Sequence, residues 1–195
     1  MQWRNSSDRY GAVTRAFHWI SAVWVLGLFG LGYWMVGLTY YDPWRQTAPF
    51  WHKSLGVLFA VFLLLRLLWS WAQRKPVPLA NHSTLVRFSS KAMHVLLYVL
   101  LVSIIVSGYL ISTADGRPIS VFGWFDVPSL VSGIRNQEDI AGEVHAILAW
   151  TLMGLVLVHA LAALKHHFFD RDDTLRRMAG RPHRTPVTSK GATHV

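Results

Sequence analysis

The sequence contains no cysteine among its 195 residues. This absence excludes cysteine-ligated iron–sulfur clusters, zinc ribbons, covalent c-type haem, disulfides and cysteine nucleophiles, so any metal must be bound by histidine, methionine or carboxylate groups. Charged residues are also scarce, at 15%, compared with about 25% in ordinary soluble domains. The composition therefore argues against a soluble globular domain and against a disordered chain.

Apolar residues are abundant instead, at 52% of the chain. A helix needs about 20 mostly apolar residues to cross roughly 30 Å of hydrocarbon, and four stretches meet this need: 17–38, 54–71, 92–111 and 144–164. They lack the polar stripe of a soluble amphipathic helix. The first is too long for the apolar region of a signal peptide and is expected to be retained. The sequence predicts an all-α membrane protein with a bundle of four transmembrane helices.

The positive charges predict its orientation. Lysine and arginine concentrate in the N-terminal arm, the second connection and the C-terminal tail, whereas the first and third connections contain four of them and six acidic residues. Both termini are therefore expected on the cytoplasmic side of a bacterial inner membrane. This topology, with attraction to anionic lipid, accounts for the net charge of +9, and no nucleic-acid partner is expected. The transmembrane domain is expected over residues 1–178, and residues 179–195 as a disordered, basic cytoplasmic tail.

Histidines occur at matching depths of the predicted helices. His18 and His159 lie near the inner ends of their spans, and His52 and His145 near the outer ends. The fourteen residues from His145 to His159 rise about 21 Å and return to within about 40° of the same helix face. Two such pairs suit bis-imidazole ligation of two b-type haems. Zinc, which prefers three or four ligands at one locus, fits less well, and a satisfied polar contact is the alternative for each single histidine.

Three basic residues are candidates to bind haem propionates. Arg66 follows His52 by fourteen residues and so faces the same interior at the inner depth, unless its side chain extends to the cytoplasmic headgroups. Arg15 lies one turn before the inner histidine of the first span, and Lys53 is adjacent to His52. Interfacial lysines and arginines are also common without such a role.

Two further histidines lie at the inner depth. His94 is either an axial ligand in place of His18 or His159, or a neighbour that hydrogen-bonds a propionate, and we favour the neighbour. His166 follows His159 by seven residues on nearly the same face, closer to the cytoplasm. There an imidazole can hydrogen-bond a quinone carbonyl and supply protons, or it is simply a solvated interfacial histidine. His82 lies in a polar segment and is expected to have no role.

The sequence resembles the bacterial cytochrome b561 family from about residue 9 to residue 178. The resemblance is carried by Arg9-Tyr10, His18-Trp19, His52-Lys53-Ser54-Leu55-Gly56, Arg66-Leu67-Leu68-Trp69, Ser107-Gly108-Tyr109, the His145/His159 pair and the run from Ala163 to Met178. It implies a four-helix inner-membrane protein with two b haems that exchanges electrons with quinone. It also implies His18, His52, His145 and His159 as the haem ligands.

Within that family, the sequence looks most like members that oxidise periplasmic superoxide and reduce ubiquinone. Lys53 and Arg45 would attract the superoxide anion toward the outer haem, against the acidic residues of the outer connections. One alternative is a cytochrome subunit that relays electrons to quinone from a partner dehydrogenase or hydrogenase docked on residues 112–143. A second is a haem-free structural or transport protein in which the histidines relay protons.

Overall fold

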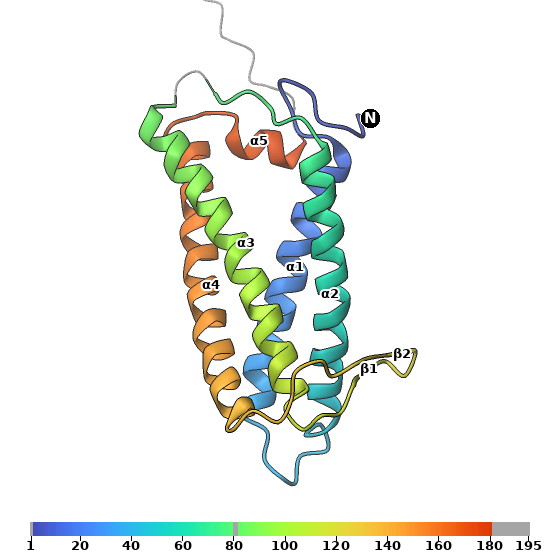
Figure 1. The fold of residues 1–195 in the computed structure, drawn as a ribbon. Helices are drawn as coiled ribbons and strands as arrows, with labels where there is room; N and C mark the ends of the chain where they lie inside the picture. Colours follow the sequence, from blue (N-terminus) through green and yellow to red (C-terminus); the bar gives the residue numbers. More distant parts are fainter. Residues whose placement is uncertain (1, 80–81, 181–195) are drawn as a thin grey trace, which may run out of the picture.

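The computed structural model describes residues 2–79 and 82–180. Within these residues the main elements are four long helices that run side by side as a bundle (Figure 1), each long and apolar enough to cross a membrane. They are α1 (Ala12–Val36), α2 (Thr47–Ala72), α3 (Thr84–Ser112) and α4 (Gln137–Phe168). The predicted four-helix membrane bundle is therefore confirmed. Residues 181–195, which make up most of the predicted tail, lie outside the described part of the chain.

The helices extend beyond the apolar runs that predicted them. α2 begins at Thr47 instead of Ser54, and α4 begins at Gln137 instead of Val144. Residues expected to form loops, 47–51 and 137–143, are thus helical, whereas α1 ends at Val36, two residues earlier than expected. An apolar run marks only the part of a helix that lies in hydrocarbon, and backbone hydrogen bonding continues each helix into the interface.

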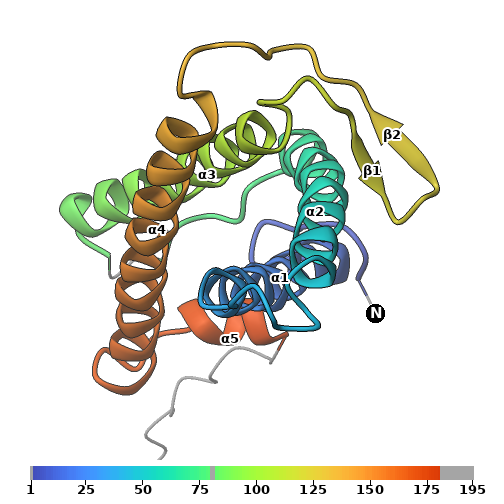
Figure 2. The same cartoon turned by 90° about the horizontal axis from the view of Figure 1, so that it is seen from below.

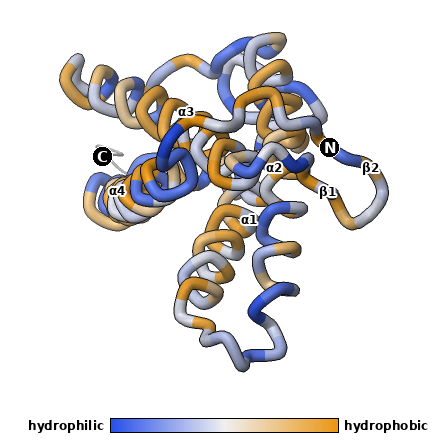
Figure 3. Tube along the Cα trace, turned by 60° about the horizontal axis from the view of Figure 1, so that its bottom comes forward, coloured by the Kyte–Doolittle hydropathy of each residue, from blue (hydrophilic) through white to orange (hydrophobic). Residues whose placement is uncertain are grey.

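The four helices pack as two antiparallel pairs. α1 packs on α2 and α3 packs on α4, while the two pairs meet between α2 and α3. Seen along the bundle, the helices follow one another around a ring in chain order (Figure 2). Apolar residues run along the helices and hydrophilic residues gather in the connections (Figure 3). Few side chains in each helix are buried, as expected where most apolar side chains face lipid.

Three segments meet at the end of the bundle that holds the N-terminus, which we call the basic end (Figure 1): the N-terminal arm, the connection between α2 and α3, and the short helix α5 (Thr174–Ala179). The Trp19 indole N–H donates to the Met178 carbonyl at 3.1 Å. Arg177 donates to the Val77 carbonyl at 2.8 Å, and the Val77 N–H donates to the Ser7 carbonyl at 2.8 Å. α5, which the sequence analysis did not predict, therefore covers the end predicted to face the cytoplasm.

The opposite end, which we call the hairpin end, carries a small antiparallel β-hairpin of β1 (Ile119–Val121) and β2 (Phe125–Val127). The sequence analysis expected only a loop here. Phe122 and Gly123 both have positive φ, 52° and 72°, and the Trp124 N–H donates to the Val121 carbonyl at 2.9 Å. Two successive positive φ angles are typical of a type I′ turn, the tight turn that matches the twist of paired strands.

The hairpin is attached to α2 through Ser54, which is fully buried. The Phe122 N–H donates to Ser54 Oγ at 3.2 Å, and that hydroxyl donates to the Ser120 carbonyl at 3.4 Å. The Phe122 ring also contacts the ring of Trp51, with centroids 5.1 Å apart. These contacts place the hairpin beside the start of α2, next to the outer histidine of that helix.

The connection from β2 to α4 is fixed to the end of α3. The Tyr109 hydroxyl donates to the Pro128 carbonyl at 3.0 Å and accepts from the Leu130 N–H at 2.6 Å. The buried side chains of Thr113 and Gln137 both donate to the Val131 carbonyl. The long connection predicted between the third and fourth spans is therefore ordered by buried polar contacts with α3.

Candidate functional site

The outer histidines of the sequence analysis face each other near the hairpin end. His52 comes from α2 and His145 from α4, and their ring centroids are 6.3 Å apart. The ring planes are inclined by 76°. Both side chains are half-buried. The structure therefore brings together the two residues that their depth in the sequence had paired.

The hydrogen bonds of His145 identify its available nitrogen. Its Nδ1 atom lies 3.0 Å from the Ile104 carbonyl oxygen and 3.0 Å from Ser107 Oγ, both on α3. An Nδ1–H that donates to a carbonyl fixes the ring tautomer and leaves the Nε2 lone pair free to bind a metal. His145 is thus oriented as metal-ligating histidines commonly are.

Glycines let the neighbouring helices approach both outer rings. A Cβ atom placed on Gly32 of α1 would lie 3.0 Å from His52 Cε1, and one placed on Gly108 of α3 would lie 3.2 Å from His145 Cε1. Carbon atoms in ordinary contact are about 3.5–4.0 Å apart. Any larger residue at either position would therefore push an imidazole away from its partner.

The inner histidines form a group of three. His18 of α1 and His159 of α4 have ring centroids 6.3 Å apart, the same separation as the outer pair. His94 of α3 lies 5.3 Å from the His159 ring, and its Nδ1 is 2.6 Å from the Ser90 carbonyl oxygen one turn earlier. His94 is exposed, whereas His18 and His159 are half-buried. His94 therefore lies beside the inner pair, and its role as a neighbour of the ligands stays a prediction.

Both pairs fit a group held by one imidazole on each side. Two rings with centroids 6.3 Å apart leave room between them for a single metal atom bound at about 2 Å to each nitrogen. In addition, His52 Nδ1 is buried without a hydrogen-bond partner among the described residues, so this ring is not held by a polar contact of its own. The donor sets are all imidazole, as bis-histidine b-type haem requires.

Arg66 contacts the helix across from it. Its Nε donates to the Tyr98 hydroxyl of α3 at 3.1 Å, and its guanidinium lies 5.3 Å from the centroid of that ring. Its charge also acts on His18 and His159. Arg66 is half-buried, so it points into the bundle near the inner histidines, as the fourteen-residue spacing predicted.

The two other predicted basic residues lie at opposite ends of the bundle. Arg15 lies against the C-terminal end of α5. A Cβ atom placed on Gly180, the residue that follows α5, would overlap the Arg15 guanidinium group. Lys53 is exposed at the hairpin end, next to His52. Their placement agrees with the predicted depths, and their proposed contact with propionates stays a prediction.

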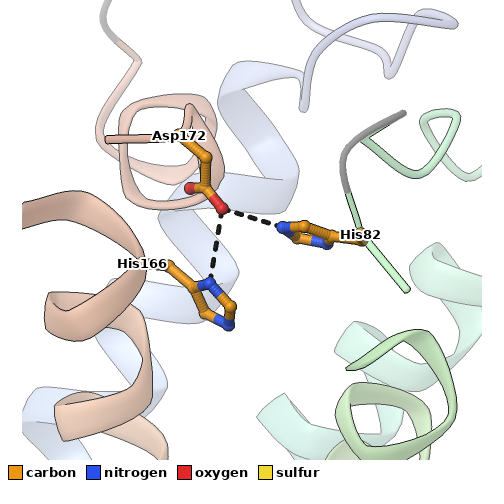
Figure 4. Close-up of side chains that lie close together, drawn as sticks. All are labelled: His82, His166 and Asp172. Carbon is orange, nitrogen blue, oxygen red and sulfur yellow. Dashed lines mark hydrogen bonds and ion pairs between the residues drawn. The ribbon is translucent and has the colours of Figure 1, made fainter. Parts of the chain in front are cut away.

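His166 belongs to a polar cluster at the basic end that sequence analysis missed (Figure 4). His166 Nδ1 lies 2.7 Å from an Asp170 carboxylate oxygen and 3.4 Å from one of Asp172. His82 Nε2 lies 2.8 Å from that same Asp172 oxygen. The expectation that His82 has no role needs one correction, because His82 and His166 both contact the carboxylate of Asp172. The only signal in the sequence was the two aspartates that follow His166 closely.

The two aspartates are ionised more readily than usual. The hydrogen bond from Lys165 lowers the pKa of Asp170. Burial would raise the pKa of Asp172, but hydrogen bonds from His82 and from Thr174 outweigh it and hold that pKa below its ordinary value. The cluster therefore presents negative charge to the imidazole of His166.

Comparisons with known proteins find matches over most of the chain. The sequence profile of the family described as "Prokaryotic cytochrome b561" matches residues 9–181. The chain is 51% identical to "Cytochrome b561 homolog 2" of Escherichia coli (strain K12) over 181 residues, which cover 93% of this chain and 96% of the relative. It is 27% identical to "Probable superoxide oxidase CybB" of Yersinia pestis, over 71% of this chain and 76% of that protein. It is 25% identical to "Probable Ni/Fe-hydrogenase B-type cytochrome subunit" of Rhizobium leguminosarum bv. viciae, over 90% and 87% respectively.

Proposed function

Because this chain belongs to the prokaryotic cytochrome b561 family of bacterial multi-pass membrane electron-transfer proteins, we propose that it oxidises superoxide at the hairpin end and reduces ubiquinone at the basic end. The observation that carries the proposal is the presence of two histidine pairs with equal ring separations, 6.3 Å, near opposite ends of one bundle. The family implies b-type haem, and two pairs imply two haems. The transmembrane domain proposed for residues 1–178 contains all the residues involved.

Each haem would be held between two helices. His52 and His145 would bind the outer one and His18 and His159 the inner one, with His94 beside the inner site. When bound, the haems supply one-electron redox chemistry, which the side chains of this protein lack. Arg66, Arg15 and Lys53 are the cations proposed to pair with the propionates.

At the hairpin end, one exposed cation lies directly beside the outer histidine pair, because Lys53 follows His52. The outer connections as a whole contain more acidic than basic residues, so attraction of an anion would depend on this local charge. A superoxide anion attracted to Lys53 would give up one electron near His52 and leave as dioxygen.

At the basic end, His166 would bind the quinone. Its Nδ1 lies 2.7 Å from an Asp170 oxygen and 3.4 Å from an Asp172 oxygen, and its Nε2 would be left to hydrogen-bond a quinone carbonyl. Reduction of one ubiquinone to ubiquinol takes two electrons, from two superoxide anions, and two protons from the predicted cytoplasmic side. His166 and its carboxylate partners would deliver these protons.

The test is stopped-flow mixing of the purified, oxidised protein with superoxide after a pyridine-haemochrome count. We expect two haems per chain, rapid haem reduction, and reoxidation only when ubiquinone is added. A haem count of one, or haems that stay oxidised in superoxide, would contradict the proposal.

A second candidate is a cytochrome subunit that receives electrons from a partner dehydrogenase or hydrogenase. Large apolar side chains project from the loops of the hairpin end, where Trp124 is 75% and Leu130 is 81% exposed. Such side chains suit a docked protein, although aromatic residues are also common at membrane interfaces. Haems that stay oxidised in superoxide but are reduced by a co-purifying dehydrogenase would favour this candidate.

A further inference from the structure

The cluster of His82, His166 and Asp172 joins three separate segments of the chain (Figure 4). His82 comes from the connection between α2 and α3, His166 from the last turn of α4, and Asp172 from the turn before α5. Their ligand atoms, two imidazole nitrogens and one carboxylate oxygen, all lie within 4.8 Å of one another. Among the described residues, no other group of three histidines, aspartates or glutamates meets this condition.

The carboxylate of Asp172 is held in place by the backbone. Its side chain is only 2% exposed. Asp172 Oδ1 accepts from the Thr174 N–H at 2.8 Å, and the Asp172 N–H donates to the His166 carbonyl at 3.0 Å. These two bonds leave Oδ2 directed at both imidazoles, 2.8 Å from His82 Nε2 and 3.4 Å from His166 Nδ1. The donor atoms are thus arranged before any ligand arrives.

We propose that His82, His166 and Asp172 form a binding site for one divalent transition-metal ion, with Zn²⁺ as its best-suited occupant. Two imidazoles and one carboxylate, with a fourth position left to water, form a donor set that zinc accepts readily. Ligand atoms bound to zinc at about 2 Å in a tetrahedron lie about 3.3 Å apart. The separations from Asp172 Oδ2 to the two imidazole nitrogens, 2.8 and 3.4 Å, are close to this value, and all three ligand atoms lie within 4.8 Å of one another.

The surrounding charges indicate an exchangeable ion rather than a permanent structural one. The second carboxylate, Asp170, lies 2.7 Å from His166 Nδ1 and favours a cation. Lys165 opposes it, because its ammonium is 2.7 Å from the same Asp170 side chain. The site is separate from both histidine pairs. It shares His166 with the proposed quinone site, so an ion on His166 Nδ1 would replace the carboxylate contacts that the quinone proposal assigns to this residue.

Zinc binding is to be measured on the purified, haem-loaded protein in detergent, by competition with a chromogenic zinc indicator after treatment with a chelator. The background carries His183→Ala and His194→Ala, so that the histidines of the C-terminal tail do not contribute. We expect one Zn²⁺ per chain. His82→Ala and Asp172→Asn should each weaken binding at least 100-fold, beyond the roughly 10–100-fold effect typical of groups that only surround a metal ligand.

His167→Ala is the matched control, because His167 is adjacent to His166 but outside the cluster, and it should leave the affinity unchanged. Absence of zinc binding by the background protein, or equal affinity in His82→Ala, would overturn the proposal. If a variant loses its haem spectrum and so its fold, zinc K-edge X-ray absorption of the background protein decides. Two imidazoles in the first coordination shell are expected, and a shell without them would refute the site.

Discussion

The contact between Gly32 and the ring of His52 gives a sharp test of the outer pair. In Gly32→Ala, the new methyl group would lie 3.0 Å from His52 Cε1, about 0.5–1 Å closer than ordinary carbon contacts. The neighbour is a ring whose position is proposed to be fixed by a metal bond, so it cannot turn aside as a flexible side chain would. Overpacking of this kind costs about 1–3 kcal/mol, while alanine gains up to about 1 kcal/mol over glycine within a helix.

The expected net cost, up to about 2 kcal/mol, falls on the outer site alone. Gly32→Ala should therefore lose one haem or shift the reduction potential and spectrum of one haem, with the other unchanged, as measured by pyridine haemochrome and redox titration. Gly27→Ala is the matched control on the same helix, because a Cβ there meets no atom within 4 Å. If Gly32→Ala keeps two haems with both potentials at their wild-type values, the assignment of His52 as a ligand is refuted.

Three further predictions concern the two ends of the bundle. His145→Ala should reduce the haem count from two to one, and an unchanged count by pyridine haemochrome would exclude the proposed pairing. His166→Ala should slow reoxidation of the haems by ubiquinone but not their reduction by superoxide; equal slowing of both steps in stopped-flow traces would argue against a quinone role. The lowered pKa of Asp172 means that its ionised form stabilises the basic end above the ordinary aspartate pKa of about 3.9, and that this stabilisation is lost as pH falls through the lowered value. Limited proteolysis with an acid-stable protease between pH 5 and 2 should therefore show that α5 of the wild type becomes cleavable only as the pH falls. In Asp172→Asn, α5 should be cleavable already at pH 5, and identical pH profiles of cleavage in the two proteins would contradict this.

The membrane helices could be predicted because the requirement is simple: about 20 apolar residues in a row, wherever they occur. The helix ends could not, since residues 47–51 contain a proline, which suits a loop or the first turn of a helix, and the polar residues of 137–143 are compatible with both helix and loop. The strands of the hairpin are too short for an alternating pattern to be recognised. Its turn depends on Phe122 adopting a left-handed conformation that is uncommon for this residue type.

The facing histidines could be anticipated because helical rise converts sequence spacing into depth. His145 and His159 share one helix, so their relative position follows from the number of residues between them. The cluster at the basic end could not be anticipated in the same way, since His82 and Asp172 are 90 residues apart and meet through connections whose paths no periodicity describes. Gly32 likewise looks like any glycine of a membrane helix until the rotation of α1 against α2 is known.

α4 contributes one histidine to each pair, and it therefore fixes the spacing between the two pairs, which the other helices cannot change. The distance between the two pairs along the axis of α4, about 21 Å for fourteen residues, is set by the covalent and hydrogen-bond geometry of a single helix. Loosening of the bundle by heat, detergent or a packing mutation alters how closely α1 and α2 approach α4 within each pair. It leaves the spacing between the pairs unchanged, so α4 alone sets the length of the proposed electron path between the two pairs.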